Sequence, residues 1–377
     1  MKAYEKHHKL KYETKDSPEH IFAQIKAKSA AYFASHKTNR YGNLRLLLKL
    51  VSMALIVGIA YVGILHSHNF GFLLFFYIVF GLMFLIIGIN FGHDAAHHCV
   101  TGHRKFDNLL FQLIFGLQGL SGYVWQIRHN FSHHIFPNVY ENDTDLEMSG
   151  LILLSPHQKK LAIHKYQHIY APFVYLTFSL AWIFFVDISM FVRKKHANLK
   201  LGKIPAIEVV KLILIKTTYL FTFIYIPYLI TGLPLLQILS AYLLMNFSVS
   251  IFLAFTFFIS HHVLEADYAE PDHSKAAVSG SWVHHQIVST IDFCPESPVG
   301  NYIFGGFNLH IAHHIFPEVS HIHYPELTRI IRETLEENNL DWYKSFGFFD
   351  GVISHLTLLK RNGSGQFEHE NYLTPIL

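Results

Sequence analysis

The chain has 377 residues, of which 51% are hydrophobic and 15% are charged, and its formal net charge at pH 7 is +3. Soluble proteins carry about 25% charged residues, so this composition favours an integral membrane protein over a soluble one. The small net charge gives no argument for binding to nucleic acid, and we expect no nucleic-acid partner.

Four apolar runs are each long enough to span a bilayer, which takes about 20 helical residues. The loops that join the first two and the last two contain no Lys or Arg, whereas basic residues such as Arg40, Arg45 and Arg104 gather at the opposite ends. The positive-inside rule therefore predicts that these opposite ends and both termini lie in the cytosol. The runs occupy residues 46–65, 70–91, 209–230 and 235–259.

Two further apolar stretches are not expected to cross the bilayer. Residues 109–119 are too few, and Asp187 interrupts the stretch at 171–191. Histidine clusters lie on both sides of this second stretch, and they share one compartment only if the chain between them crosses an even number of times. We therefore interpret 171–191 as an interfacial or re-entrant helix and 109–119 as an interfacial helix.

The polar remainder predicts a cytosolic cap. We interpret 265–281 as a surface loop, and we expect one helix to begin at Pro325 and another to cover 351–359. The expected fold is an all-α integral membrane protein with four transmembrane helices, interfacial helices and a cytosolic helical cap that holds a dimetal site. It forms one functional domain, made of an N-terminal segment, a membrane core and a helical tail at 1–44, 45–320 and 321–377.

Histidines form three clusters at the predicted cytosolic ends of the spans. Residues three or four apart share one face of a helix, so each cluster presents a forked pair of imidazoles. Imidazole is the commonest protein metal ligand near neutral pH, and the total exceeds the four ligands of one tetrahedral ion. A lone histidine would more often be an ordinary core residue, but three forks favour a metal site with the ligands His93, His97, His98, His129, His133, His134, His310, His313 and His314.

Other residues are candidates for an additional ligand. His261 and His262 end the last span, and one of them could join the clusters; we prefer His262. His285 is a weaker candidate, because contact with a substrate or a capping role explains it equally well. Cys99 could be a soft ligand, but a small buried thiol packed beside the site is the better interpretation.

Polar neighbours of the clusters could orient the imidazoles. A metal-bound histidine needs a hydrogen-bond partner on its other ring nitrogen, which fixes its tautomer. A role in a solvated loop or a helix cap explains these neighbours equally well. They are Asp94, Asn130, Asp143, Asp145 and Asn308.

The clusters resemble the boxes of the integral-membrane fatty acid desaturase superfamily, which read HxxxH, HxxHH or HxxxHH, and (H/Q)xxHH. Here they are His93-Asp-Ala-Ala-His97-His98, His129-Asn-Phe-Ser-His133-His134 and His310-Ile-Ala-His313-His314. The resemblance covers most of the chain and is nearest to bacterial acyl or linoleoyl-CoA desaturase-like and front-end members. Its flanking motifs are Arg40-Tyr-Gly-Asn43, Trp125-Gln-Ile-Arg-His-Asn130, Ser281-Trp-Val-His-His-Gln286 and Gly305-Gly-Phe-Asn308.

This resemblance implies two iron ions held by the box histidines and by a histidine of the last span, which maps to His262. It also implies O2 as a co-substrate and the removal of two hydrogens from a long acyl chain. Trp125, Trp282, His285 and Gln286 would then lie near the metal or the acyl chain, although core packing explains the aromatic residues equally well.

The sequence contains no haem-binding His-Pro-Gly-Gly stretch. The resemblance therefore implies no bound haem and a separate electron donor, such as ferredoxin or cytochrome b5 with its reductase. Boxes one and three resemble methyl-end members while box two resembles front-end members, so the double-bond position stays open, as does the acyl carrier (CoA, acyl carrier protein or lipid). We expect the protein in a bacterial inner membrane with its metal site in the cytosol.

Two other functions are compatible with histidine boxes. A hydroxylase or acetylenase would use the same scaffold, because the same oxidant can transfer oxygen or abstract hydrogen again. A histidine-rich metal transporter would instead need ionisable ligands along a path within the bilayer. The position of the boxes at the helix ends disfavours the transporter.

Overall fold

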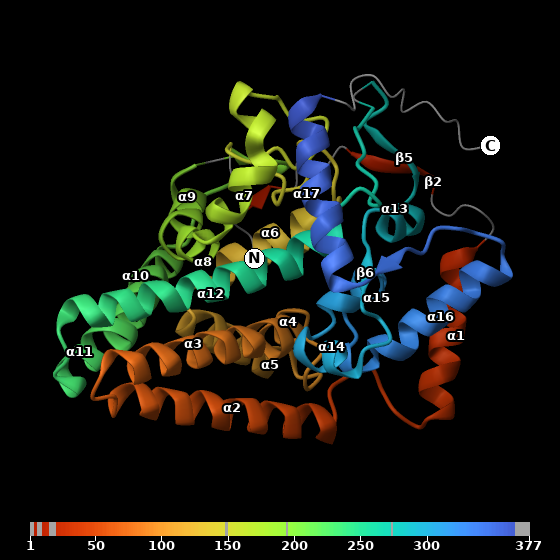
Figure 1. The fold of residues 1–377 in the computed structure, drawn as a ribbon. Coiled ribbons are helices and arrows are strands. Elements are labelled where there is room, and N and C mark those ends of the chain that lie inside the picture. The colour runs from red at the N-terminus through yellow and green to blue at the C-terminus, as the bar shows by residue number, and fades with distance from the viewer. Residues whose placement is uncertain are drawn as a thin grey trace.

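The computed structural model describes residues 4–5, 10–14, 20–147, 150–193, 195–272 and 274–365. The expected N-terminal segment and helical tail therefore lie partly outside the described residues. Most of the described chain is helical (Figure 1).

Among the described residues, four helical segments are long and apolar enough to cross a membrane, as the sequence predicted, and each lies within a few residues of its expected bounds. Leu44–Leu65 is α2, and Leu235–His261 is α12. The other two are interrupted by short π-helical turns: Phe70–Ala96 comprises α3 (Phe70–Ile87), η1 (Gly88–Gly92) and α4 (His93–Ala96), and Ala206–Thr231 comprises α10 (Ala206–Leu220), η5 (Phe221–Tyr225) and α11 (Ile226–Thr231).

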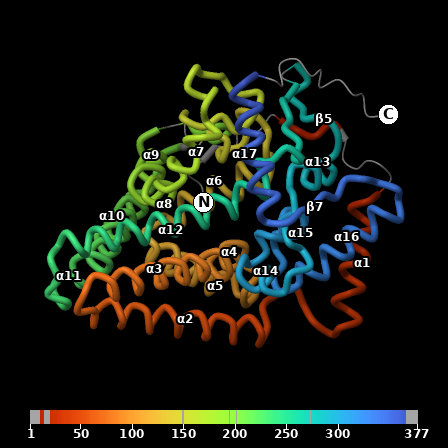
Figure 2. Tube along the Cα trace, viewed as in Figure 1, coloured from red at the N-terminus to blue at the C-terminus, as the bar shows by residue number. Residues whose placement is uncertain are grey.

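The long helices run side by side, with α3 packed between α2 and α12 (Figure 2). Large apolar side chains on the outer face of α2 are exposed, including Leu48, Leu55 and Ile59. In water such a face would be unstable, but a hydrocarbon environment favours it. These exposed side chains therefore mark the lipid-facing surface.

The stretch expected to be re-entrant is sharply bent. It consists of two helical pieces, Ala162–Tyr175 and Phe178–Val192, which meet at an angle of 78°. The stretch is therefore not one straight span. A bent pair of this kind is either a re-entrant helix, which stays our prediction, or a broken span. Its parts are η3 (Ala162–Tyr166), α7 (Gln167–Tyr175), α8 (Phe178–Ala181), η4 (Trp182–Val186) and α9 (Asp187–Val192).

Asp187, which interrupted the apolar pattern, is fully buried and joins three elements. Its Oδ2 accepts hydrogen bonds from Lys216 Nζ on α10 at 2.6 Å and from the backbone N of Ser121 at 2.9 Å. Ser121 lies in the turn between α5 (Arg104–Leu117) and α6 (Gly122–Arg128). In that turn Gly119 has a φ of 80°, and the Tyr219 ring occupies the space that a Cβ would need. The ion pair therefore fixes α9 and α10 against this turn.

One end of the long helices is covered by shorter elements that form the cap (Figure 1). Pro325 is in the first turn of α16 (Tyr324–Glu337), as predicted. The apolar stripe of α16 packs against Ile21 and Ile25 of α1 (Ile21–Ser35). The expected helix at 351–359 is part of α17 (Phe348–Ser364). The remaining cap elements are α13 (Trp282–Val288), α14 (Pro298–Ile303), η6 (Phe307–Leu309), α15 (His310–Ile315) and η7 (His321–His323).

The prediction of a loop throughout 265–281 is wrong at its end. Ala277–Ser281 forms β5, which pairs in parallel with β2 (Lys11–Thr14). The partner strand is more than 250 residues away in the sequence, so no local pattern could indicate the pairing. The other strands are β1 (Tyr4–Glu5), β3 (Lys195–His196), β4 (Leu199–Leu201), β6 (Asp292–Phe293) and β7 (Ser345–Phe346).

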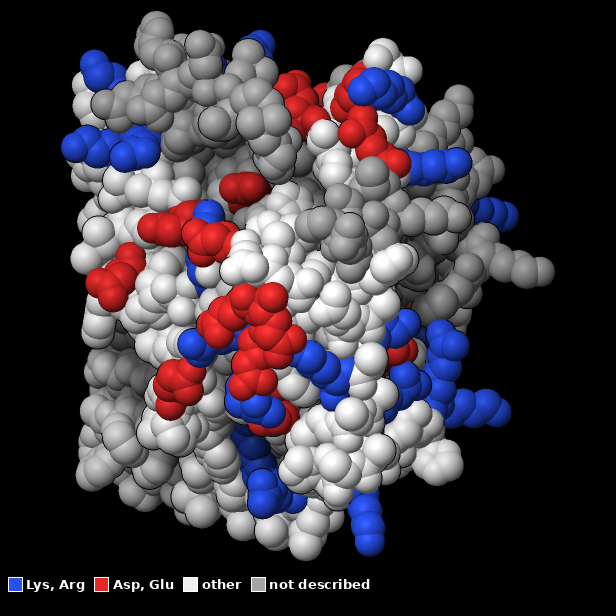
Figure 3. All heavy atoms as spheres, turned by 90° about the vertical axis from the view of Figure 1, so that its right-hand side faces the viewer, with Lys and Arg blue, Asp and Glu red and all other residues white. Residues whose placement is uncertain are grey.

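Charged side chains of both signs cluster on the face of the cap (Figure 3). Arg329 pairs with Glu326 and Glu333 along α16, and Arg332 pairs with Glu296 at 2.7 Å. Exposed pairs of this kind contribute little stability, but they require water. The cap end of the molecule is therefore the aqueous end.

Candidate metal centre

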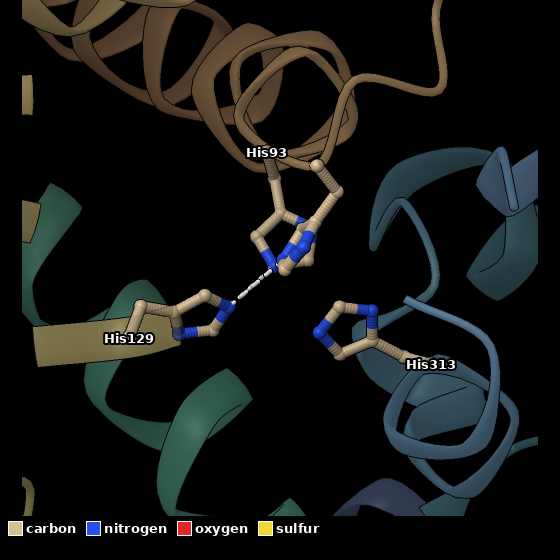
Figure 4. A group of neighbouring side chains, drawn as sticks. His93, His129 and His313 are labelled. Carbon is tan, nitrogen blue, oxygen red and sulfur yellow. Dashed lines mark hydrogen bonds between the residues drawn. The ribbon is translucent and has the colours of Figure 1, made fainter. Parts of the chain in front are cut away.

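The first histidine group combines all three boxes. His93 and His97 come from α4 and the residue that ends it, His129 from the π-helical turn η2 (His129–His133), and His313 from α15. Figure 4 shows the rings of His93, His129 and His313 converging from three separate elements. The Nε2 of His129 lies 3.2 Å from that of His93 and 3.1 Å from that of His97. One metal ion could be held by all four.

The second group lies beside the first and consists of His133, His261, His310 and His314, all of them buried. The Nε2 atoms of His133 and His261 are 3.1 Å apart. The His310 ring centroid lies 4.6 Å from that of His261 and 4.9 Å from that of His314. This group could hold a second metal ion.

His134 lies between the two groups. Its Nε2 is 2.9 Å from the Nε2 of His129, and its ring centroid is 4.6 Å from those of both His313 and His314. The site is therefore one continuous cluster of nine histidines, in which His134 is close to ligands of both groups.

The geometry and protonation of the cluster fit metal ions. Metal–nitrogen bonds of about 2.0–2.1 Å place neighbouring ligand nitrogens roughly 2.9–3.4 Å apart, which agrees with the separations given above. The Nε2 atoms of His310, His313 and His314 are buried without a hydrogen-bond partner in the described residues, although buried polar atoms are normally satisfied. Burial lowers the pKa of these three side chains well below the ordinary value, so they are neutral and offer free lone pairs.

Two aspartates orient His133. Its Nδ1 lies 3.2 Å from a carboxylate oxygen of Asp143 and 3.3 Å from one of Asp145. Burial alone would lower the pKa of His133, but these carboxylates raise it above its usual value. A carboxylate on Nδ1 holds the tautomer whose Nε2 faces the metal and makes it a stronger ligand.

Other ligands are oriented by partners from distant parts of the chain. His314 Nδ1 is 2.8 Å from Gln286 Oε1, which was a sequence candidate. Tyr324 OH lies 3.1 Å from His313 Nδ1, and the backbone O of Ser289 accepts from His261 Nδ1 at 3.1 Å. Sequence reasoning missed the last two contacts, because a tyrosine or a backbone carbonyl carries no local signal of such a role.

The structure differs from the sequence prediction at two histidines. The sequence favours His262 as the additional ligand, but its Nδ1 lies 3.3 Å from Tyr268 OH. The histidine that lies beside His133 is His261. His261 ends α12, and consecutive helical residues point about 100° apart, so only one of the two can face the cluster. His98 has a φ of 59° and lies near Arg104 and Asp107, outside both groups.

Two further candidates, Trp125 and Asp94, lie next to the boxes. Trp125 stacks on the His129 ring, with centroids 4.1 Å apart. Asp94 accepts from Ser320 Oγ at 2.7 Å and contacts His321 Nδ1 at 2.9 Å, so it ties box one to the cap without contacting a ligand ring.

Several other candidates have contacts that do not involve ligand rings. His285 bonds to the backbone O of Pro137 at 2.8 Å, and Trp282 packs on Phe22. Asn308 donates to Asn301 at 2.6 Å, and Asn130 Oδ1 is buried without a partner in the described residues. The Cys99 thiol donates to the backbone O of Asp94, in agreement with a packed buried thiol.

A mostly apolar cavity leads from the first group into the membrane layer. Its cluster end is lined by His93, His129 and Trp125, and its far end by Phe80 and Met245. Twelve residues separate Met245 from Phe257, another lining residue, which corresponds to about 18 Å along α12. Since C–C bonds of about 1.5 Å at angles of about 111° advance an extended chain by roughly 1.3 Å per carbon, this distance corresponds to roughly 14 carbons.

The fold and this cluster define a helical integral membrane protein with a histidine-rich metal site at the aqueous end of its spans. The family model for fatty acid desaturases matches residues 68–346. The chain therefore belongs to the fatty acid desaturase family and is an oxidoreductase that desaturates fatty acyl chains.

Curated relatives support the same assignment. The chain is 28% identical over 330 residues to the sn-1 linoleoyl-lipid 6-desaturase of Synechocystis sp., covering 86% of this chain and 90% of that protein. It is 29% identical over 290 residues to the enzyme of the same name from Arthrospira platensis, covering 75% of this chain and 76% of that protein. It is 27% identical over 354 residues to the acyl-lipid (8-3)-desaturase of Physcomitrium patens, covering 93% of this chain and 73% of that protein.

Proposed function

We propose that the protein uses two iron ions and O2 to introduce a double bond into the acyl chain of a membrane lipid. The observation that carries this proposal is the pair of adjacent four-histidine groups, the first of which contributes His93 and His129 to the wall of a mostly apolar cavity. When bound, iron would supply the oxidising power that an unactivated methylene requires. An acyl chain attached to a lipid is favoured over other carriers because the similar proteins are named as linoleoyl-lipid or acyl-lipid desaturases.

The chain's own residues would bind the iron ions and orient the acyl chain. His93, His97, His129 and His313 would hold one ion, and the second group, with His261, would hold the other. Asp143, Asp145, Gln286 and Tyr324 would fix the imidazoles, and the cavity would exclude water and hold the acyl chain. The ligand set therefore departs from the sequence expectation at His98 and His262.

The enzyme would have a defined orientation in the membrane and a separate electron donor. Residues 45–320 would form the core, the cap would lie in the cytosol of a bacterial cell, and a separate protein such as ferredoxin would supply electrons. The charged surface of the cap and the basic residues at the cap ends of the spans support this orientation.

Product analysis tests the reaction. Wild type and His313→Ala are expressed in a bacterial host, and total acyl chains are compared by mass spectrometry with localisation of double bonds. We expect a product two hydrogens lighter from wild type only, because His313 is central to the first group. A product one oxygen heavier would instead establish the hydroxylase alternative, and identical profiles from two iron-loaded proteins would refute the desaturase proposal.

Tag accessibility tests the orientation. We expect tags at residue 200 and in the cap to be protected in intact cells, and a tag at the hairpin tip near Asn69 to be labelled from outside. The reason is that residue 200 follows the re-entrant helix and stays on the cap side. Labelling at residue 200 from outside would show that Ala162–Val192 crosses the membrane.

A further inference from the structure

An arginine lies in the wall of the cavity. Arg128 directly precedes His129, is 5% exposed, and is the only Lys or Arg among the described residues that line the cavity. Its Nη2 donates to the backbone O of Thr144 at 2.7 Å and to Asp145 Oδ1 at 3.3 Å. Its Nε–H is buried and has no acceptor in the described part of the chain. A buried charged donor without an acceptor is costly.

A second unsatisfied donor lies beside it. The guanidinium of Arg128 lies over the ring of Trp182 at 5.5 Å, and Trp182 also lines the cavity. The indole Nε1–H of Trp182 is likewise buried without a partner within the described residues. Two N–H groups from separate elements, α6 and η4, are thus available on one part of an otherwise mostly apolar wall.

The chemistry of these donors selects the group that would satisfy them. A long acyl chain carries its hydrogen-bond acceptor at one end, as the carbonyl oxygen of its ester or thioester, and that oxygen has two lone pairs. A free carboxylate fits less well, because Asp145 already balances the charge of Arg128 and would repel a second anion. The wall therefore suits a neutral carbonyl oxygen.

We propose that Arg128 Nε and Trp182 Nε1 bind the carbonyl oxygen of the acyl substrate and so set the position of the new double bond. This inference rests on the proposed desaturase function. Arg128 and His129 line the same cavity, and Asp145, the ion-pair partner of Arg128, lies 3.3 Å from His133 Nδ1, so the bound carbonyl lies close to the histidine cluster. The double bond then forms in the half of the chain nearer the carbonyl, and the methyl end occupies the apolar far end of the cavity between Phe80 and Met245.

The test uses conservative variants of the full-length, iron-loaded enzyme. Trp182→Phe keeps the ring and removes the N–H, and Arg128→Lys keeps the charge and removes the Nε donor. Each is supplied with linoleoyl phosphatidylcholine vesicles and, in a parallel arm, with linoleoyl-CoA, so that turnover identifies an ester or a thioester carrier. We expect the KM for the carrier that is used to rise about tenfold, and the product to spread over neighbouring double-bond positions while iron content stays unchanged.

A matched control lies on the same helix. Gln126 on α6 is also buried with an unpartnered Nε2 but does not line the cavity, so Gln126→Leu should keep the wild-type KM and a single product position. If Arg128 only held Asp145 in place, its variant would lower turnover without moving the double bond. Unchanged KM and unchanged double-bond position in both Trp182→Phe and Arg128→Lys would overturn the inference. No desaturated product from the iron-loaded wild type would overturn the proposed function and this inference together.

Discussion

Replacing His261 with alanine is expected to reduce turnover at least a hundredfold and to lower the iron content from two ions per chain to about one. His261 is the contribution of α12 to the second group, and its Nε2 lies 3.1 Å from that of His133. Loss of residues that merely support a ligand already costs 10–100-fold in metal affinity, so loss of a ligand costs more. Iron analysis of the purified protein and product formation measure the two effects.

The neighbouring histidine provides the control. His262 is equally buried, but its ring faces Tyr268. We expect His262→Ala to keep both irons and most of the activity, with a loss of stability of about 2 kcal/mol from the cavity left behind, measured by thermal unfolding. The reverse pattern, with iron lost from His262→Ala and kept in His261→Ala, would contradict the arrangement of the second group.

Replacing Val249 with tryptophan is expected to reduce turnover of an 18-carbon chain about a hundredfold, a loss of the size that misplacing a substrate produces, while both irons remain bound. Val249 lines the cavity between its far end and the histidines. It lies eight residues before Phe257, or about 12 Å along α12, so a large ring there would block the methyl end. Activity toward acyl chains of different length and iron content are measured together.

A lipid-facing residue of the same helix is the control for this variant. Leu244 is 38% exposed on the outer surface and does not line the cavity, so Leu244→Trp should keep wild-type activity. Shorter acyl chains should retain more activity than long ones in Val249→Trp. Equal losses for all chain lengths would indicate a packing defect, and full activity toward the long chain would show that the substrate does not occupy this cavity.

The spans and the box histidines were predictable from the sequence because they depend on local pattern. About 20 apolar residues must form a helix when no water is present to satisfy the backbone, and histidines three or four residues apart share a helix face. Even Asp187 was informative, since one carboxyl in an apolar stretch marked the helix that proved to be sharply bent.

Other features could not be read from local pattern. The parallel pairing of β2 with β5 joins residues more than 250 positions apart. The π-helical turn η1 inserts an extra residue just before box one, η2 does so within box two, and both change which residue faces the cluster. The carbonyl of Ser289 orients His261 only because the cap folds back over the end of α12, and the hydroxyl of Tyr324 reaches His313 only because α16 packs against α15.

The amino-acid sequence by itself determined the membrane class of this protein, the number of long apolar helices and most of the histidines that meet, because each of these follows from composition or from helical periodicity. The tertiary structure alone decided that His261, and not His262, joins the second group. Both residues stand at the end of one helix, and the choice depends on how far α12 is rotated against the turn that carries His133, which is set by packing between segments distant in sequence.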